Sequence, residues 1–296
     1  MTKLAIDSGQ TGIKVRAGSA SATYPGIRTN VPLFPQLAEV IQAAAGQFGI
    51  TPDQVAIGTT GLTAVEADPA ELLASLIPAG VRSVVLAHDS VTSFLGAMGY
   101  QHGVVSAAGT GVVTLGVGPL GHSRVDGWGN LIGDAGSGYW IGRLGLDQVM
   151  RAFDGRGPAT ALTEVVTREF PALEDAYIKL QTDPDRVRRI AGFAKAVARL
   201  ADHDEVCAQV CAQAGTELAC SAAAAVANVG LDSPRISLIG GVFKAEPIMR
   251  ACVSKLTERW PGFQPYPAHG DGLDGVEALF DLPAEHPLAE LVRVAR

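Results

Sequence analysis

The sequence lacks the local motifs that define several large enzyme classes. It contains no Gly-x-x-x-x-Gly-Lys-Ser/Thr phosphate loop, no His-Glu-x-x-His metalloprotease helix and no Gly-x-Ser-x-Gly hydrolase elbow. Its six histidines are scattered, and its four cysteines include no Cys-x-x-Cys pair. These absences exclude the P-loop mechanism and leave no local pattern for a zinc or iron–sulfur centre.

Charge and long apolar runs are also scarce. Charged residues make up 18% of the chain, and no basic stripe accompanies the net charge of −7, so we expect no nucleic-acid partner. No apolar run reaches the roughly 20 residues that a membrane-spanning helix needs. Residues 1–3 lead directly into a predicted strand, without the apolar region of a signal peptide. We therefore expect a cytoplasmic protein with no membrane partner.

Apolar residues and glycine are abundant. Hydrophobic residues account for 47% of the 296 positions, enough for the core of one large or two ordinary domains, and the 35 glycines indicate many tight turns. Three of the four cysteines lie in an alanine-rich helical pattern. We interpret all four as small apolar residues in a reducing compartment: Cys207, Cys211, Cys220 and Cys252.

Two glycine- and hydroxyl-rich turns are the most informative feature of the chain. The first, Asp7–Gly12, follows an apolar run, and the second, Ala108–Gly111, follows a valine-rich run. Each precedes another run rich in β-branched residues, which predicts a hairpin. Glycine lets backbone N–H groups approach an anion, and a neighbouring Ser or Thr adds a donor. One such turn in each half of the chain suggests a nucleotide held between two lobes.

Periodicity and turn signals predict strands that alternate with helices. This alternation indicates mixed sheets covered by helices, with a boundary between lobes near residues 100–102. Two Gly-x-Gly-x-x-Gly matches, at 116–121 and 270–275, open no helix within a βαβ unit, so we interpret both as turns. We expect strands within 3–25 and near 54–57, 83–87, 103–107, 112–116 and 236–239. We expect helices near 36–48, 69–76, 91–98, 138–153 and 247–259. Much of 159–229 and the tail after residue 283 should also be helical.

Asp7, Thr11 and Lys14 are the candidate metal and phosphate groups of the first turn. A carboxylate at a strand end beside a phosphate loop can hold Mg²⁺ through water, because Mg²⁺ keeps several of its waters. Thr11 can donate to a phosphate oxygen, and Lys14 can add positive charge. The alternative is a plain hairpin with Asp-Ser-Gly turn chemistry.

Asp89 is the candidate general base. It follows a predicted central strand, where carboxylates in α/β proteins usually face a ligand. It could instead cap the next helix, although Ser90 could also serve as that cap. His88 is an alternative active group, but neighbouring strand residues point to opposite faces, so we expect its side chain to point away from that of Asp89.

The segment 127–140 has an unusual density of glycine. That density costs backbone entropy unless positive φ angles or the close approach of a ligand require it. Asp134 lies in this segment, near a predicted helix start. It can accept hydrogen bonds from the hydroxyl groups of a polyol, and the alternative is a helix cap.

Taken together, these motifs resemble the N-acetylglucosamine kinases of the BadF/BadG/BcrA/BcrD ATPase family, within the actin, sugar-kinase and heat-shock chaperone superfold. Asp7–Thr11 and Gly109–Gly111 resemble the two phosphate motifs of the family, and Gly240–Val242 resembles its adenosine motif. Residues 126–142, with Gly-Trp-Gly and Gly-Asp-x-Gly-Ser-Gly-Tyr-Trp-Ile-Gly, are the most specific piece. The similarity runs from residue 3 to about residue 256.

The resemblance implies an α/β protein with a two-lobed, ribonuclease H-like fold and a mixed sheet flanked by helices in each lobe. It assigns residues 1–101 to an N-terminal sugar-kinase lobe and residues 102–280 to a C-terminal nucleotide-binding lobe. A C-terminal helix at 281–296 is expected to pack back on the first lobe. Because dimers are common among such kinases, we also expect a homodimer.

The matching positions supply a set of expected site residues. Asp89 matches the catalytic base, and Asp7 is expected to hold Mg²⁺ through water. The expected sugar contacts are Asn30, Gly127, Trp128 and Asp134. The expected ATP contacts are Ser8, Gly9, Thr11, Lys14, Gly109, Thr110, Gly111, Gly240 and Gly241.

Some positions depart from the family pattern, and they leave the sugar undecided. Ser8 and Gln10 replace smaller residues in the first turn, and Ala135 replaces the usual Glu after Asp134. Further departures fall at Pro32, Val112 and Val113.

The resemblance implies ATP-dependent phosphorylation of the 6-hydroxyl of an amino sugar, with N-acetylglucosamine as the first expectation. Glucosamine or another hexose derivative is the alternative acceptor. Two other functions stay open: an ATP-driven activator of electron transfer, and a sugar-sensing regulator without catalysis.

Overall fold

The computed structural model of the chain describes residues 1–9, 11–28, 31–62 and 68–296. Its contacts divide it into two compact units, the first made of Met1–His102 with Pro267–Arg296 and the second of Gly103–Tyr266. The break between the units after His102 lies one residue from the boundary that we expected after residue 101. Residues 267–280, expected in the second domain, belong to the first unit, because helix α11 (Gly272–Ala278) packs against helix α3 (Asp89–Met98).

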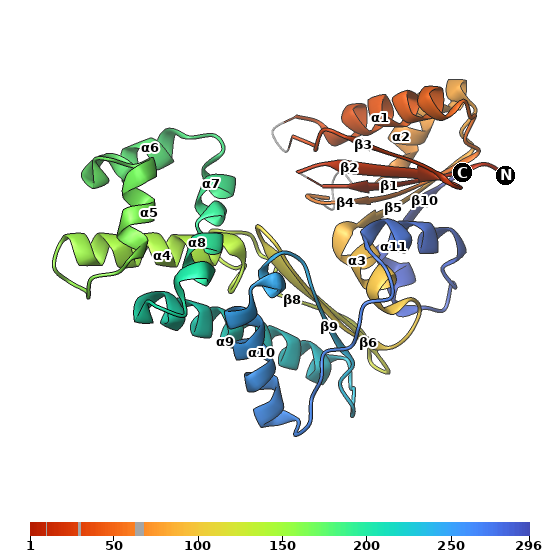
Figure 1. Cartoon of the computed structure of the whole chain (residues 1–296). Helices are drawn as coiled ribbons and strands as arrows, with labels where there is room; N and C mark the ends of the chain where they lie inside the picture. The colour runs from red at the N-terminus through yellow and green to blue at the C-terminus, as the bar shows by residue number, and fades with distance from the viewer. Residues whose placement is uncertain (10, 29–30, 63–67) are drawn as a thin grey trace. The chain divides into compact units, whose positions relative to one another are not determined.

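A six-stranded sheet forms the framework of the first unit (Figure 1). Its strands are β1 (Lys3–Ser8), β2 (Ile13–Ala17), β3 (Ala20–Tyr24), β4 (Gln54–Thr59), β5 (Ser83–His88) and β10 (Arg293–Ala295). The order across the sheet is β10-β5-β4-β1-β2-β3, with β1, β4 and β5 parallel and the other strands antiparallel to their neighbours. The hairpin and the two strands predicted in this region are confirmed.

Helices cover both faces of this sheet (Figure 1). Helices α1 (Leu33–Phe48) and α2 (Pro69–Leu76) lie on one face, and α3 and α11 lie on the other. Leu4 and Ile6 of β1 belong to the apolar cluster that includes Leu37 of α1. Because strand residues alternate between faces, Asp7 lies on the opposite side, toward α11. The helices predicted at 36–48, 69–76 and 91–98 are confirmed.

The segment 270–275 is a helix start, so its interpretation as a turn is wrong. Asp271 Oδ1 accepts hydrogen bonds from the N–H groups of Leu273 and Asp274, and Asp274 Oδ2 accepts one from the N–H of Asp271. This reciprocal capping box begins α11. A Cβ atom at Gly275 would lie 1.7 Å from the carbonyl oxygen of Thr92, so glycine is required for the close approach to α3.

The tail after Pro283 is also not the α-helix that we predicted. It forms a 3-10 helix at Pro287–Leu291 and then strand β10, which pairs antiparallel with β5. Pro287 suits a helix start, but the sheet offers backbone partners that a continued helix would leave unused. Ala295 is buried as part of the apolar cluster of the first unit.

A four-stranded sheet of order β8-β7-β6-β9 forms the framework of the second unit. Its strands are β6 (Gly103–Ala108), β7 (Val112–Gly118), β8 (Gly121–Val125) and β9 (Ile236–Ile239). Three of these strands are confirmed, whereas β8 was not predicted. The sequence Gly-His-Ser-Arg-Val has no apolar alternation, and it becomes a strand through its antiparallel pairing with β7. The expected turn at 116–121 is limited to the link between these two strands.

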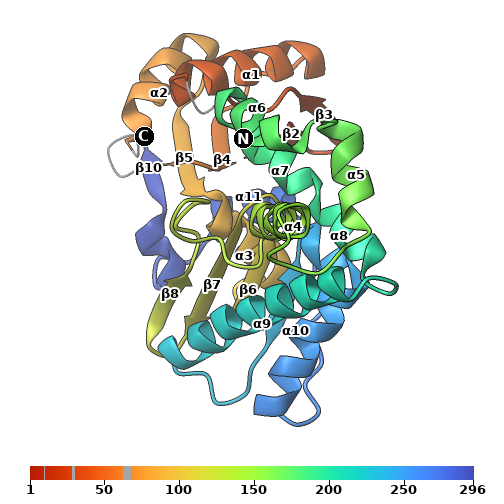
Figure 2. The same ribbon diagram turned by 90° about the vertical axis from the view of Figure 1, so that its left-hand side faces the viewer.

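Seven α-helices belong to the second unit, and α9 (Glu205–Asn228) packs against its sheet (Figure 2). They are α4 (Gly138–Phe153), α5 (Leu162–Glu169), α6 (Ala176–Thr182), α7 (Arg186–Gly192), α8 (Ala194–Leu200), α9 and α10 (Glu246–Arg259), in agreement with the prediction. Helix α9 is long and apolar enough to cross a membrane by length and composition alone, but more than half of its most apolar stretch is buried. That burial is typical of a core helix.

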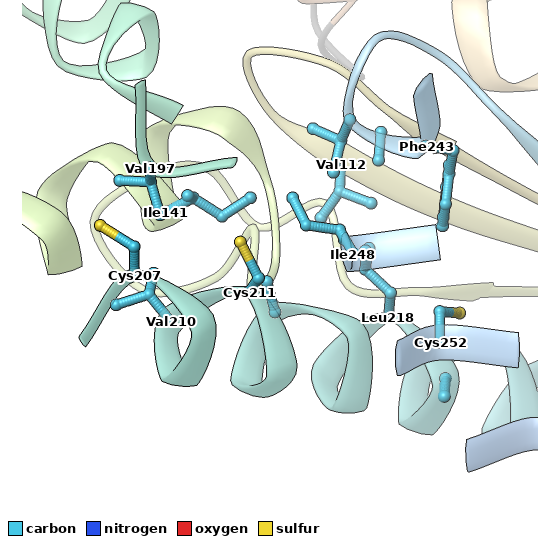
Figure 3. Close-up of a cluster of buried hydrophobic side chains, with 14 of the residues drawn as sticks. Val112, Ile141, Val197, Cys207, Val210, Cys211, Leu218, Phe243, Ile248 and Cys252 are labelled. Carbon is cyan, nitrogen blue, oxygen red and sulfur yellow. The ribbon is translucent and has the colours of Figure 1, made fainter. Parts of the chain in front are cut away.

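The core around α9 contains three of the four cysteines (Figure 3). Cys207, Cys211 and Cys252 are buried among apolar side chains, whereas Cys220 is exposed, and all four are free thiols. Burial raises the pKa of Cys207 and Cys252 to about 12 and that of Cys211 to about 11. The interpretation as buried small apolar residues is therefore confirmed for three positions and wrong for Cys220.

Candidate active site

The first glycine turn joins β1 to β2 and places Asp7 directly opposite Lys14 in the antiparallel register. The N–H of Gly9 donates to the carbonyl oxygen of Gly12 at 3.1 Å and closes the turn, and Thr11 is exposed at its tip. Ser8 is fully buried, and its Oγ has no hydrogen-bond partner among the described residues. A buried hydroxyl without a partner costs free energy unless a ligand or water satisfies it. Gln10 lies outside the described residues.

Asp7 lies against the start of α11. A Cβ atom at Gly272 would be 3.0 Å from Asp7 Oδ2, so the absence of a side chain there makes room for the carboxylate. Burial raises the pKa of Asp7, the charges of Asp271 and Asp89 raise it further, and Lys14 opposes them. A cation beside Asp7 would relieve this accumulation of negative charge.

Lys14 has a partner that the sequence did not predict. Its Nζ lies 2.8 Å from Oδ2 of Asp271, and both side chains are about half exposed. Burial tends to raise the pKa of Asp271, but the hydrogen bond from Lys14 and the N–H groups of α11 outweigh it and lower that pKa. The signal that could have identified Asp271 is the Asp-x-x-Asp spacing of its capping box.

Asp89 is the first residue of α3, and His88 caps that helix. The Nδ1 atom of His88 accepts a hydrogen bond from the N–H of Ser90 at 3.2 Å, so neither Asp89 nor Ser90 is the cap. The same Nδ1 lies 2.9 Å from Asp89 Oδ1. The expectation that the two side chains point apart is therefore wrong, because strand alternation ends where the chain turns into α3.

The second glycine turn is held against the start of α4. The N–H of Gly109 donates to the carbonyl oxygen of Gly111 at 2.8 Å. The N–H groups of Gly138 and Tyr139 donate to the carbonyl oxygens of Gly109 and Thr110 at 2.8 Å and 3.0 Å. These bonds fix the carbonyl groups toward α4 and leave the turn itself exposed.

Asp134 lies beside this turn, and its relative exposure is only 8%. A Cβ atom at Gly111 would be 2.6 Å from Asp134 Oδ2, so the carboxylate occupies the space that a side chain would need. Burial raises the pKa of Asp134, while the N–H of Gly129, which donates to Oδ1 at 3.2 Å, lowers it. Asp134 does not cap α4, because Ser137 Oγ accepts the hydrogen bond from the N–H of Trp140.

Among the remaining candidate residues of the second unit, Gly240 lies directly beside the same turn. Gly240 has a φ of +100°, and a Cβ atom there would be 2.3 Å from the carbonyl oxygen of Ala108, directly before the turn. Gly127 has a φ of +78°, and Trp128 is 60% exposed with the guanidinium of Arg124 4.9 Å from its ring centre.

The predicted residues thus form two groups, one in each unit. The first unit brings Asp7, Lys14 and Asp89 near one another, together with the unpredicted Asp271. The second unit brings the glycine turn at 109–111 close to Asp134 and to Gly240. Gly127 and Trp128 belong to the loop that ends at Asp134, and Gly241 follows Gly240. Asn30 lies outside the described residues.

The first group fits a magnesium ion bound through water. Asp7 is a partly buried carboxylate whose charge is disfavoured by burial and by two neighbouring acids. Within the described part of the chain, no group of three or more His, Cys, Asp or Glu residues is arranged to hold a metal. A single carboxylate suits a cation that keeps most of its water shell.

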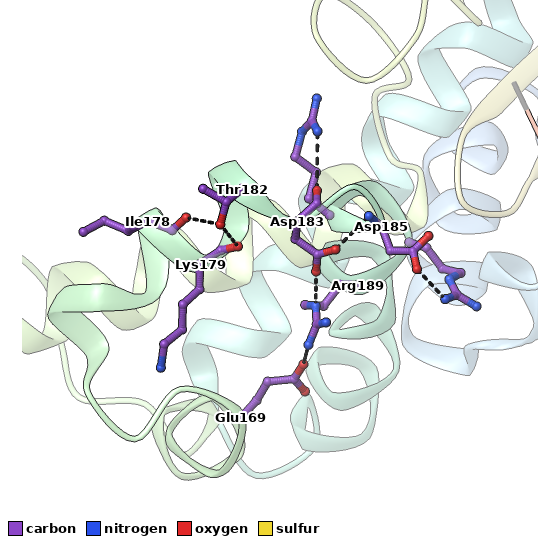
Figure 4. Close-up of polar contacts among 9 residues, drawn as sticks. Glu169, Ile178, Lys179, Thr182, Asp183, Asp185 and Arg189 are labelled. Atoms are coloured by element: carbon purple, nitrogen blue, oxygen red, sulfur yellow. Dashed lines mark hydrogen bonds and ion pairs between the residues drawn. The ribbon is translucent and has the colours of Figure 1, made fainter. Parts of the chain in front are cut away.

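A cavity of about 460 Å³ lies elsewhere in the second unit, along α5, α7 and α8, and contains none of the predicted residues. Two of its three arginines are engaged with acidic side chains (Figure 4). Arg189 pairs with both Glu169 and Asp183, and Arg188 pairs with Asp185. These pairs leave less positive charge for an anionic ligand than the residue types alone would indicate.

A family model described as the BadF/BadG/BcrA/BcrD ATPase family matches residues 2–270 of the chain. The N-acetyl-D-glucosamine kinase of Dictyostelium discoideum is 32% identical over 177 residues, covering 56% of this chain and 55% of the relative. The N-acetylmuramic acid/N-acetylglucosamine kinase of Clostridium acetobutylicum is 31% identical over 136 residues, covering 43% of this chain and 42% of the relative. The matched part spans about half the length of these curated relatives.

A solved structure has the same fold. It is that of a provisionally named N-acetylglucosamine kinase from Chromobacterium violaceum, with a TM-score of 0.72 and 23% identity, and it covers 94% of this chain and 98% of that chain. At this identity the likeness establishes the fold alone. The expected α/β fold, with a helix-flanked mixed sheet in each half, is confirmed.

Proposed function

The chain belongs to the BadF/BadG/BcrA/BcrD ATPase family, and we propose that it is an ATP-dependent kinase of an amino sugar, with N-acetylglucosamine as the acceptor. The observation that carries the proposal is the contact between Asp134 and Gly111. A buried carboxylate that can accept bonds from sugar hydroxyls lies against a glycine turn suited to phosphate. The names of the Dictyostelium and Clostridium relatives support this substrate class.

The two glycine turns would bind the phosphates of ATP. Backbone N–H groups and hydroxyls would donate to phosphate oxygens, and the exposure of Thr11, Gly109 and Thr110 supports a ligand at the two turns. Gly240 and Gly241 would accept the adenosine beside the second turn. The full set of proposed phosphate contacts is Ser8, Gly9, Thr11, Lys14, Gly109, Thr110 and Gly111.

Asp7 would hold Mg²⁺ through water. A bound magnesium ion would neutralise negative charge on the phosphates during transfer. Lys14 would have to exchange Asp271 for a phosphate oxygen in order to contribute its charge. The half-exposed Lys14–Asp271 pair makes this exchange inexpensive, because surface ion pairs contribute only about 0–1 kcal/mol.

Asp89 would accept the proton of the 6-hydroxyl. The sugar oxygen forms a bond to the γ-phosphorus while the bond from that phosphorus to the β,γ-bridging oxygen breaks. Phosphoryl transfer has a loose transition state, so the proton leaves late and a carboxylate suffices as the base. Asn30, Gly127, Trp128 and Asp134 would hold the sugar, and the contact of Asp134 with Gly111 supports its place beside the phosphates.

We also propose that the protein acts in the cytoplasm, as a homodimer. The need for ATP and the four free thiols support the first point. The oligomeric state is a prediction that sedimentation of the full chain would test.

A coupled assay of sugar-dependent ADP release tests the proposed function. The panel comprises N-acetylglucosamine, glucosamine, glucose, N-acetylmannosamine and N-acetylmuramic acid, the last because of the name of the Clostridium relative. We expect the highest kcat/KM with N-acetylglucosamine, and mass spectrometry should identify the 6-phosphate. ADP release that no sugar accelerates would reject a sugar kinase.

A further inference from the structure

The carboxylate of Asp126 organises the loop that contains the proposed sugar contacts. Its Oδ1 accepts hydrogen bonds from the N–H groups of Gly127 and Asp134 at 2.7 Å and 2.8 Å, and its Oδ2 accepts one from the N–H of Ala135 at 2.8 Å. A single side chain therefore binds the backbone at both ends of the span 127–135. No motif in the sequence indicated this role.

The backbone of Asp126 is itself unusual. Its φ is +58°, in the left-handed region that residues other than glycine, asparagine and aspartate rarely adopt. Asp134 has the same conformation, with a φ of +57°. A Cβ atom at Gly133 would lie 2.6 Å from Asp126 Oδ1, so the loop closes tightly around the carboxylate.

The neighbouring contacts extend this arrangement to the aromatic ring. Arg124 Nε donates to the carbonyl oxygen of Asp126 at 3.2 Å, and Arg124 Nη2 donates to the carbonyl oxygen of Gly127. The same guanidinium lies 4.9 Å from the ring centre of Trp128. Asp126 thus fixes the backbone of Gly127 and Asp134 and the turn from which Trp128 projects.

We propose that Asp126 is a positioning residue of the sugar site, which presets Gly127, Trp128 and Asp134 for the sugar without touching it. This proposal rests on the proposed function. Three backbone N–H groups donate to the two oxygens of Asp126, whereas the hydrogen bond from the N–H of Gly129 engages Asp134 through Oδ1, so we assign the ligand to Asp134. Hydrogen bonds to a charged acceptor are stronger than those to a neutral one, so a carboxylate holds this loop better than an amide would.

Two variants of Asp126 test the effect of its carboxylate while the left-handed backbone conformation is kept, and a third variant serves as the control. Asp126→Gly keeps the left-handed conformation and removes both acceptors, whereas Asp126→Asn keeps the conformation and one acceptor. Asp204→Asn is the matched control, because Asp204 also accepts backbone N–H groups, from Ala161 at 2.6 Å and Cys207 at 2.8 Å, away from the loop.

Steady-state kinetics and amide hydrogen exchange of the full chain provide the readouts. We expect Asp126→Gly to raise the KM for N-acetylglucosamine about tenfold while the KM for ATP changes less than about twofold. Asp126→Asn should fall between this variant and the wild type. Exchange should accelerate at Gly127, Asp134 and Ala135 in Asp126→Gly, and at Ala161 and Cys207 in Asp204→Asn, whose KM for the sugar should stay at the wild-type value.

The outcomes distinguish this proposal from the proposed function. A wild-type KM for the sugar in Asp126→Gly would overturn the positioning role and leave the kinase proposal intact. Equal increases in the KM for sugar in Asp126→Gly and Asp204→Asn would show that the effect is general destabilisation. This result would also overturn the positioning role of Asp126. A wild-type protein that phosphorylates no sugar would overturn the kinase proposal, and this proposal with it.

Discussion

Turnover should depend on the carboxylate of Asp89 more than on any other side chain. Asparagine has nearly the same shape but cannot accept the proton of the sugar hydroxyl. We expect Asp89→Asn to lower kcat by about 10²- to 10⁴-fold, with the affinity for a non-hydrolysable ATP analogue nearly unchanged. Asp185→Asn, which alters an exposed partner of Arg188, serves as the control. Wild-type kcat in Asp89→Asn would remove Asp89 from the role of base.

His286 should make the stability of the first unit depend on pH. Burial lowers its pKa from the ordinary value of 6.5, the charge of His102 lowers it further, and the backbone of Tyr100 opposes both. Its Nδ1 accepts the N–H of Leu288, which requires the neutral ring. The unfolded chain therefore binds the proton more readily, so the free energy of unfolding decreases as the pH falls below about 6.5.

The variant His286→Asn tests this dependence, because asparagine can accept the capping hydrogen bond but does not titrate. Urea unfolding at pH 8 and at pH 5.5 should show a smaller loss of stability in His286→Asn than in the wild type. His203→Asn, at an exposed position of the second unit, should keep the wild-type difference. Equal losses in the wild type and His286→Asn would show that this ring does not contribute.

At the residue scale, the sequence indicated which side chains are candidates for the site better than it indicated their contacts. Asp7, Asp89 and Asp134 could be proposed because a carboxylate at a strand end or in a glycine-dense loop has few structural reasons to be there. The contact of Asp271 with Lys14 and the contacts of Asp126 within its loop could not be proposed, although the Asp-x-x-Asp spacing of residues 271–274 is a signal for a helix cap. Asp271 acts on a residue 257 positions away, and Asp126 acts on backbone N–H groups, which every sequence contains.

At the scale of elements, the contact between α3 and α11 is limited by glycine. A Cβ atom at Gly275 would overlap the backbone of Thr92, so the two helices would have to separate. We expect Gly275→Ala to lower the free energy of unfolding by about 1–3 kcal/mol, measured by thermal or urea unfolding. Gly46→Ala in α1 is the control, because nothing lies within 4 Å of the added Cβ and alanine favours a helix. Equal stability of Gly275→Ala and the wild type would mean that the contact is looser than described.

Elements with clear periodicity were predicted, and elements fixed by pairing were not. Helix α1 and strand β4 follow from their apolar spacing alone. Strands β8 and β10 contain little apolar alternation and form because β7 and β5 offer them backbone partners. Helix α11 was missed because its glycines suit a turn in isolation and reveal a helix only once α3 packs against them.

At the scale of the whole molecule, the first unit is built from two separate segments of the chain. Residues 267–296 contribute α11, β10 and a set of polar contacts to residues 1–102. Tyr100 donates to the carbonyl oxygen of Ala278 at 2.8 Å, and Arg16 Nη1 lies 2.7 Å from Asp274 and 2.9 Å from Glu277. From the sequence we expected residues 281–296 to pack on the first lobe, but not residues 267–280, because the Pro- and Gly-containing stretch 265–272 indicates a turn without showing which unit the following residues join.

Fragments of the chain test this organisation. We expect residues 103–266 to unfold cooperatively on their own, because they contain a complete sheet and core. Residues 1–102 alone should show no cooperative transition, whereas the same residues joined to 267–296 by a flexible linker should. Calorimetry and circular dichroism provide the measurement. A cooperative transition of 1–102 alone would show that the second segment is dispensable.

This division sets an order on biosynthesis. A ribosome that has translated residues 1–102 has produced a sheet without its outer strand and without one of its covering helices. The second unit, contiguous in the gene, is complete first and can fold while the earlier segment waits for residues 267–296. A nascent chain that stops short of those residues would therefore carry the candidate base Asp89 on an unfinished scaffold, exposed to proteases and chaperones.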